Sequence, residues 1–159
     1  MIHRVTIENT SDSKSFAVNL ARFIDLGDLI TFEGELGAGK TFIIGQIIRT
    51  LSNNEDSIIS SPTFNLVHNY SSPKGNIWHF DLYRLKAPEE IYELGYEDTH
   101  AGIAFIEWPQ IISHILPRDR LDIKIIAGND EKREIILNPM GLWIEKLKGF
   151  SNEYKSKDK

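Results

Sequence analysis

A glycine-rich segment between a predicted strand and a predicted helix constrains this chain more than any other feature. The strand is Leu29-Ile30-Thr31-Phe32, which is short and favours β-structure. The segment that follows reads Gly34-Glu35-Leu36-Gly37-Ala38-Gly39-Lys40-Thr41. Beyond it, apolar residues recur on one side of a helix at Ile43, Ile44, Ile47, Ile48 and Leu51. The chain therefore passes from strand to helix through a loop with little side-chain bulk.

This loop has the composition that phosphate binding requires. The glycines at 34, 37 and 39 permit positive φ angles and a close approach of the backbone to an anion. A helix that begins at Lys40 adds the positive end of its dipole. Lys40 can reach the β- and γ-phosphates, and Thr41 offers a hydroxyl to Mg²⁺. The alternative is a chance match in a turn-rich loop, which the flanking elements argue against, so the sequence predicts an ATPase that binds MgATP here.

Two acidic residues compete for the metal-side role that a nucleotide hydrolase needs at the end of a neighbouring strand. Glu107 ends the apolar run 103–106, as expected of a buried parallel strand beside the loop strand. Asp81 ends an alternating run, which fits a half-covered antiparallel strand. We therefore assign the metal role to Glu107 and a second catalytic or switch role to Asp81. A surface ion pair for Glu107 and a strand-end cap for Asp81 are the alternatives.

Several neighbouring residues are weaker candidates. Trp108 follows Glu107 directly and could move with the nucleotide, although an aromatic residue at a strand end is more often core or rim. His79 shares a strand face with Asp81, and a satisfied structural histidine is the preferred interpretation. Arg133, taken alone, is best interpreted as solvated. The other histidines, His3, His68, His100 and His114, lack the spacing of a metal site.

The remaining pattern predicts one α/β domain over residues 1–150. A strand at 5–7 precedes a helix that is capped by Thr10, Ser11 or Asp12 and stopped by Gly27. Further elements are expected as strands at 58–59 and 103–106, helices at 88–94 and 109–116, and two hairpins that join 64–70 to 77–82 and 121–126 to 134–137. Residues 151–159 are expected to form a solvated, poorly ordered polar tail.

Composition excludes several classes of protein. The chain has no cysteine, which excludes disulfides and thiolate metal sites and makes a reducing cytoplasm the expected location. No apolar run approaches the roughly 18–20 residues of a membrane helix, and the first residues lack the apolar stretch of a secretory signal. A net charge of −5 lowers the expectation of a basic nucleic-acid-binding face. We expect no membrane or DNA partner, and contact with any RNA only indirectly or weakly, through a partner that holds most of it.

With these residues in view, the chain resembles the TsaE (YjeE) family of bacterial ATPases. The resemblance runs from the first predicted helix to about Leu137 and rests on four segments. These are the loop at 34–41, Ser61-Pro62-Thr63-Phe64, His79-Phe80-Asp81-Leu82-Tyr83-Arg84-Leu85 and Ile106-Glu107-Trp108-Pro109. The first is shared by many nucleotide-binding proteins, whereas the second and third, in this order and at this distance, are far more specific.

The resemblance implies a P-loop NTPase-like fold, in which a mixed sheet with a parallel core and antiparallel hairpins is flanked by helices. It implies a role in threonylcarbamoylation of the adenosine beside the anticodon, in tRNAs that read codons starting with A. The ATPase would not perform the transfer itself. It would bind a TsaB–TsaD heterodimer, and its nucleotide cycle would reset that complex for multiple turnovers.

The resemblance also implies roles for single residues. Lys40 and Thr41 would take the phosphate and magnesium roles, Glu107 the metal role and Asp81 that of catalytic support, so Lys40, Asp81 and Glu107 are the catalytic candidates. Thr63 falls in a switch-like loop. The nucleotide-binding candidates are Thr10, Gly37, Ala38, Gly39, Lys40, Thr41, Phe42, Trp108 and Arg133, with Thr10 and Arg133 near the base or ribose.

Two positions depart from the family pattern. Phe42 stands where the family usually places a second threonine, and Ile44 stands where an arginine is common. A contact from that second hydroxyl or from that arginine is therefore not expected in this chain.

Two other functions remain compatible with the loop. A small-molecule kinase would use the same loop but usually carries an arginine-rich lid, whereas Arg118, Arg120 and Arg133 are scattered here. A nucleotide-dependent interaction module would bind the nucleotide without significant turnover.

Overall fold

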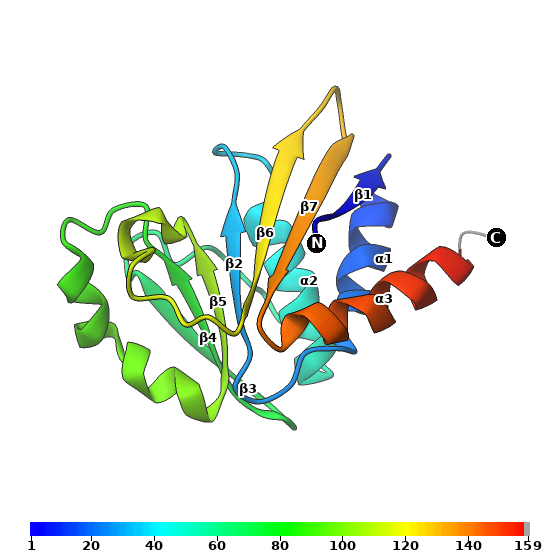
Figure 1. The fold of residues 1–159 in the computed structure, drawn as a ribbon. Helices are drawn as coiled ribbons and strands as arrows, with labels where there is room; N and C mark the ends of the chain where they lie inside the picture. Colours follow the sequence, from blue (N-terminus) through cyan, green and yellow to red (C-terminus); the bar gives the residue numbers. More distant parts are fainter. Residues whose placement is uncertain (158–159) are drawn as a thin grey trace.

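The structure, a computed structural model, describes residues 1–157 and is built on one seven-stranded sheet in the order β1-β7-β6-β2-β5-β4-β3 (Figure 1). The strands are β1 (His3–Ile7), β2 (Leu29–Glu33), β3 (Val67–Ser72), β4 (Gly75–Asp81), β5 (Ile103–Glu107), β6 (Arg120–Ala127) and β7 (Arg133–Met140). The α-helices are α1 (Thr10–Ala21), α2 (Lys40–Ser52) and α3 (Trp143–Lys157). Three 3₁₀ helices complete the described part, namely η1 (Pro88–Leu94), η2 (Tyr96–Ala101) and η3 (Pro109–Ile112).

The centre of the sheet is parallel and its margins are antiparallel. Strand β2 pairs in parallel with β5 on one side and with β6 on the other, and β4 pairs in parallel with β5. The antiparallel pairs are β3 with β4, β6 with β7, and β1 with β7. The predicted α/β fold with a mixed sheet, a parallel core and antiparallel hairpins is therefore confirmed.

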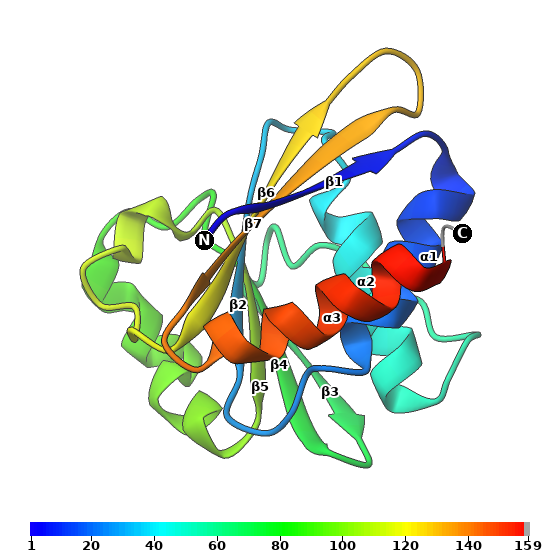
Figure 2. The same ribbon diagram turned by 45° about the vertical axis from the view of Figure 1, so that its right-hand side comes forward.

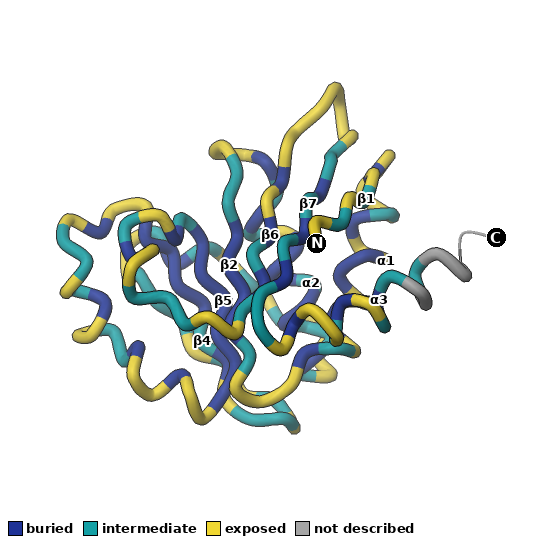
Figure 3. The backbone as a smooth tube through the Cα atoms, viewed as in Figure 1, coloured by how far each residue is buried: buried dark blue, intermediate teal, exposed yellow. Residues whose placement is uncertain are grey.

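The two faces of the sheet are covered differently, as the two views in Figures 1 and 2 show. Helices α1, α2 and α3 cover one face and contribute buried side chains such as Phe16, Ile44 and Phe150 to the larger apolar cluster. The 3₁₀ helices and their connections cover the other face beside β4 and β5, where Ile91 and Ile112 join a smaller cluster. Buried positions concentrate in the central strands (Figure 3), because these strands are covered on both faces.

Three predicted elements differ from the structure in type or extent. Residues 58–59 do not form a strand, and Ile58 is 89 % exposed. The predicted helix at 109–116 is only the short η3, which ends at Ile112 and is followed by a turn at 113–115. The first helix is capped by Asn9, whose side-chain oxygen accepts from the backbone N–H of Asp12 at 2.9 Å. It ends at Ala21, well before Gly27.

The end of the described chain is helical as far as residue 157. Helix α3 continues through Lys157, because Tyr154 stacks on Phe150 with ring centroids 5.4 Å apart and also contacts Phe16. Residues 158–159 of the predicted tail lie outside the described residues. Among the described helices, none combines the length and the apolar character needed to cross a membrane.

Candidate functional site

The glycine-rich loop connects the end of β2 to the start of α2, as the sequence predicted. Gly37 and Gly39 have φ angles of 80° and 105°, which side chains of L-residues rarely adopt. Gly39 is the residue before α2, so the loop ends directly at the amino end of that helix. The free backbone N–H groups of a helix start favour an anion at this position.

Lys40 folds back over this loop. Its Nζ donates to the backbone oxygens of Gly34 at 2.5 Å and Glu35 at 3.0 Å, and it lies 4.3 Å from the centroid of the Trp108 ring. Burial lowers the pKa of Lys40 below its ordinary value, although the nearby carboxylates of Glu107, Asp81 and Glu35 act in the opposite direction. The ammonium group is therefore held beside the loop by carbonyl oxygens and an aromatic face.

Thr41 and Glu107 meet at the carboxyl ends of β2 and β5. The Thr41 hydroxyl lies 3.0 Å from Oε1 and 3.1 Å from Oε2 of Glu107 and donates to this carboxylate. Glu107 is only 2 % exposed, and its Oε2 lies 2.7 Å from Nε2 of His79. The predicted parallel neighbour of the loop strand is thus β5, and it brings Glu107 to the first turn of α2.

Asp81 lies beside Glu107, since these two residues are partners in the register of β4 and β5. The predicted antiparallel pairing of the strand that Asp81 ends holds for β4 with β3, but β4 is also parallel to β5 and its second half is buried, so the strand is not half-covered. The Asp81 carboxylate accepts from the Ser61 hydroxyl at 2.5 Å and from the backbone N–H of Tyr83 at 3.0 Å. Thr63 donates in turn to the Ser61 hydroxyl at 3.2 Å, which connects the predicted switch loop to this acid.

One cavity of about 290 Å³ joins most of the predicted residues. Those that line it are Gly37, Gly39, Lys40, Thr41, Phe42, Thr63, Asp81, Glu107 and Trp108. Trp108 adopts a positive φ of 57°, unusual for a bulky residue, and its ring lies 4.9 Å from that of Tyr83. The strand end after Glu107 is therefore bent so that the indole closes one wall of the cavity.

Thr10 and Arg133 lie in a neighbouring cavity of about 220 Å³ on the other side of the loop. Ala38, Gly39 and Phe42 also line it, so the loop separates the two cavities. The Arg133 guanidinium donates through Nε to the backbone oxygen of Ala38 at 2.8 Å and thereby fastens the β6–β7 turn to the loop.

The sequence interpretation missed Glu131, which lines the same small cavity and accepts from the backbone N–H of Thr10 at 3.4 Å. It also gave Ser61 no role and interpreted His79 only as a structural histidine. The shared face of His79 and Asp81 was visible as alternation along β4, whereas Glu131 carries no local signal because its contact joins residues far apart in the sequence.

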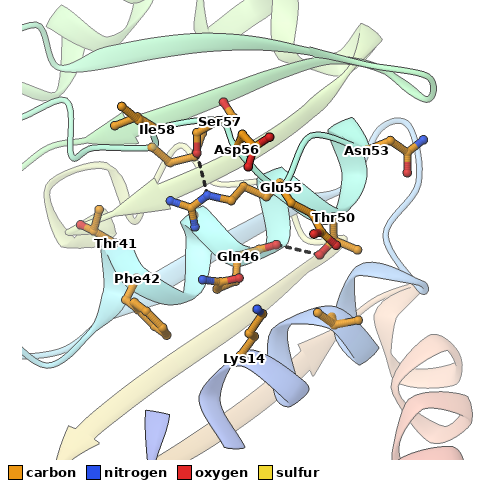
Figure 4. A pocket seen from close by; sticks show the side chains of 14 residues that line it. Lys14, Thr41, Phe42, Gln46, Thr50, Asn53, Glu55, Asp56, Ser57 and Ile58 are labelled. Atoms are coloured by element: carbon orange, nitrogen blue, oxygen red, sulfur yellow. Dashed lines mark hydrogen bonds between the residues drawn. The ribbon is translucent and has the colours of Figure 1, made fainter. Parts of the chain in front are cut away.

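A wider groove of about 750 Å³ begins at Thr41 and Phe42 and runs between α1, α2 and the segment 53–59 (Figure 4). The Arg49 side chain holds this segment against α2 by donating to the backbone oxygen of Ser57 at 2.7 Å. Phe42, which replaces the second threonine of the family pattern, lines this groove and both smaller cavities. The replacement therefore puts an apolar ring where the three spaces meet.

The donor atoms of the central cavity suit a small hard cation. A threonine hydroxyl and two carboxylates are oxygen ligands, which Mg²⁺ prefers. Within residues 1–157 no group of three or more His, Cys, Asp or Glu side chains could hold a metal by itself.

The fold and this loop define an α/β protein whose central strand leads through a glycine-rich turn into a helix, with acids at the ends of the adjacent strands. A family model described as "Threonylcarbamoyl adenosine biosynthesis protein TsaE" matches residues 7–135. The chain belongs to the TsaE family, and thus to the proteins of tRNA threonylcarbamoyladenosine biosynthesis.

Individual relatives agree with this assignment. The tRNA threonylcarbamoyladenosine biosynthesis protein TsaE of Rickettsia prowazekii is 41 % identical over 80 % of this chain and 89 % of its own length. The protein of the same name from Bacillus subtilis is 33 % identical over 87 % of each chain. The crystal structure of Bacillus subtilis YdiB superposes with a TM-score of 0.74 at 27 % identity, covering 100 % of this chain and 97 % of the other.

Proposed function

We propose that this chain binds and hydrolyses MgATP, slowly on its own, as an accessory ATPase of tRNA threonylcarbamoyladenosine modification. One observation carries the proposal: Lys40, Thr41, Asp81 and Glu107 converge on a single cavity beside the amino end of α2. A cation, a hydroxyl and two acids around a glycine-rich loop are the parts that phosphoryl transfer to water requires.

In this proposal each residue exchanges a partner within the protein for a partner on the nucleotide. Lys40 leaves the backbone oxygens of Gly34 and Glu35 and contacts the β- and γ-phosphates. Thr41 would release Glu107, and the Thr41 hydroxyl and the Glu107 carboxylate would together hold Mg²⁺. When bound, Mg²⁺ neutralises the charge that spreads over the phosphate oxygens.

Asp81 supports the attack of water and the state of the switch loop. Its carboxylate already holds Ser61 and, through it, Thr63. A γ-phosphate that attracts Thr63 would therefore also move the Ser61–Asp81 contact. We propose that MgATP orders the segments around Thr63, Asp81 and Trp108, and that hydrolysis releases them, as in other P-loop switches.

The base and ribose belong in the small cavity lined by Thr10 and Arg133, which lies across the loop from Asp81 and Glu107. Phe42 offers an apolar wall there, Glu131 offers an acceptor, and Arg133 borders the loop at Ala38. This arrangement lets the nucleotide pass over the residues Gly37, Ala38 and Gly39, with its phosphates at Lys40.

The partner we propose is a TsaB–TsaD heterodimer in the cytoplasm, with tRNA reached only indirectly or weakly. Two observations support this proposal. The chain belongs to a family of tRNA threonylcarbamoyladenosine biosynthesis. Its net charge is −5, so a partner with a basic face is better suited to hold the tRNA.

Reconstitution tests the proposal. Purified chain is added to TsaB, TsaD, tRNA and threonylcarbamoyl adenylate, and modified tRNA is counted per TsaD with and without ATP. We expect multiple turnovers only with the wild-type chain and ATP, loss with Lys40→Ala, and no loss with the exposed control Lys124→Ala. Turnover that needs neither the chain nor ATP would contradict the proposal.

Labelled γ-phosphate separates this function from the two rivals. Lys40 is the one cationic side chain among the described residues that line the central cavity, which favours water over a phosphorylated acceptor held by an arginine lid. We expect free labelled phosphate. A labelled metabolite would indicate a kinase, and binding without release would indicate an interaction module.

A further inference from the structure

We propose that His79 is a positioning residue that holds the Glu107 carboxylate in place for the Mg²⁺ end of the site. This inference rests on the proposed function, because it concerns the acid that faces the metal. A continuous chain of contacts motivates it. The Thr41 hydroxyl lies 3.0 Å from Oε1 of Glu107, and Nε2 of His79 lies 2.7 Å from Oε2 of the same carboxylate.

The register of the strands brings His79 to this carboxylate. His79 pairs with Phe105 and Asp81 pairs with Glu107 across β4 and β5. His79 therefore reaches Glu107 diagonally on the sheet face that α2 covers. Both side chains are buried, with exposed fractions of 0 % for His79 and 2 % for Glu107, so water does not compete for the contact.

The surroundings of the imidazole select its tautomer. Within residues 1–157, Nδ1 of His79 has no hydrogen-bond partner and is inaccessible to solvent. A proton on Nδ1 would be a buried donor without an acceptor, whereas a lone pair there is tolerated better. The proton therefore belongs on Nε2, which donates it to Glu107.

Packing alone does not account for this residue. An apolar side chain of similar size would fill the space without leaving a buried nitrogen unpaired. The imidazole adds a donor that fixes the rotation of the carboxylate and keeps its oxygens 3.0 and 3.1 Å from the Thr41 hydroxyl. Groups that orient metal ligands in this way commonly change metal affinity about 10- to 100-fold when they are replaced.

Two amide substitutions at His79 separate the effect of the hydrogen-bond donor from the effect of side-chain size. The amide of His79→Gln can place an N–H near the position of Nε2, whereas that of His79→Asn extends only as far as Nδ1. Binding of a fluorescent, non-hydrolysable ATP analogue is measured over a range of Mg²⁺ concentrations, with thermal unfolding as a check of folding. We expect His79→Asn to raise the Mg²⁺ concentration at half-saturation about 10- to 100-fold and His79→Gln to keep the wild-type value.

The outcomes distinguish this inference from the proposed function. Wild-type chain that binds the analogue without any dependence on Mg²⁺, or does not bind it, would contradict the proposed function itself. If wild-type binding depends on Mg²⁺ and folded His79→Asn keeps the wild-type requirement, the positioning role is overturned. Equal losses in folded Asn and Gln variants overturn it as well, because the donor would then not matter.

An NMR spectrum of the wild-type chain without nucleotide tests the inference even if a variant does not fold. Long-range ¹H–¹⁵N correlation on histidine-labelled protein reports which ring nitrogen carries the proton. We expect the His79 proton on Nε2, and a proton on Nδ1 would overturn the inference.

Discussion

At the scale of single residues, the polar groups of the candidate site are already paired with one another. Lys40 is held by two backbone oxygens and an indole, Thr41 by Glu107, and Asp81 by Ser61 and the N–H of Tyr83. The candidate side chains therefore satisfy, through contacts within the protein, the requirement that buried polar groups be hydrogen-bonded.

Trp108 should report the departure of Lys40 from this arrangement. The ammonium group lies 4.3 Å from the indole centroid, so movement of Lys40 to a phosphate changes the field at the ring. We expect ATP to change the tryptophan fluorescence of the wild type and of Trp78→Phe, and to leave that of Trp108→Phe unchanged. If calorimetry shows that nucleotide binds but the fluorescence of the wild type does not change, the proposed switch is contradicted.

Asp81 should matter for turnover more than for binding. Asp81→Asn keeps an acceptor for the Tyr83 N–H but removes the charge and the ability to accept a proton from water. We expect hydrolysis to fall about 10²-fold, the lower range for a lost acid–base group, with nucleotide affinity nearly unchanged. Phosphate release assays and calorimetry measure the two effects, and the exposed Asp98→Asn is the control. An equal fall in affinity would instead indicate a binding role.

At this scale the positions of the candidate residues could be predicted where the signal was local. The loop from Gly34 to Thr41 carries the phosphate-binding pattern in adjacent residues, and Glu107 follows directly from an unbroken apolar run. The sequence did not show that His79 is the hydrogen-bond partner of Glu107. The two residues are 28 positions apart, and only the pairing of β4 with β5 brings them together.

At the scale of elements, the loop is confined between β2, β6 and α2. A Cβ added at Gly34 would lie 2.7 Å from the backbone oxygen of Ile125 and 3.2 Å from Cβ of Ala38, whereas a Cβ at Gly37 would meet nothing within 4 Å. Gly34 is thus needed both for close packing and for its positive φ of 157°, whereas Gly37 is needed for its positive φ of 80° alone.

This difference predicts unequal costs of the same substitution. Gly37→Ala should lower the free energy of unfolding by about 1 kcal/mol, from the positive φ alone. Gly34→Ala should lower it by about 3 kcal/mol, since about 2 kcal/mol of steric overlap adds to a similar backbone cost. Urea denaturation of both variants measures the ordering, and equal losses would contradict the described packing.

Strands were predicted well where both members of a pair show alternation of apolar and polar residues. The hairpins β3–β4 and β6–β7 were expected from alternation on both sides of a turn. Ile58-Ile59 was misread as a strand because a short apolar pair says nothing of a partner. In the structure the segment is held by Arg49 instead, and Ile58 faces outward.

At the scale of the whole molecule, α3 closes the apolar cluster on the helical face of the sheet. Trp143, Leu147 and Phe150 are each at most 1 % exposed. With Tyr154 they recur at helical spacing, a signal that is present in the sequence and was not used in the sequence analysis. Phe150 packs edge-on against Phe16 and Phe23, with centroids 5.8 and 6.0 Å away.

Truncating these rings should destabilise the entire domain. Phe150→Ala should lower the free energy of unfolding by about 3–5 kcal/mol. Tyr154→Ala should lower it by about 1 kcal/mol through the lost ring pairs, whereas a solvated tail would give no change. Ile144→Ala, on the exposed side of α3, is the control. Denaturant unfolding monitored by circular dichroism measures all three.

The pairing of Thr41 with Glu107 should limit the rate at which the nucleotide binds. Because the hydroxyl and the carboxylate engage each other in the structure, we expect entry of a magnesium–nucleotide complex to be an exchange of partners and not a simple collision. In stopped-flow mixing, the observed association rate should level off at high ligand concentration, at the frequency with which this pair opens. Thr41→Ser, which keeps the hydroxyl but frees its rotation, should raise that plateau.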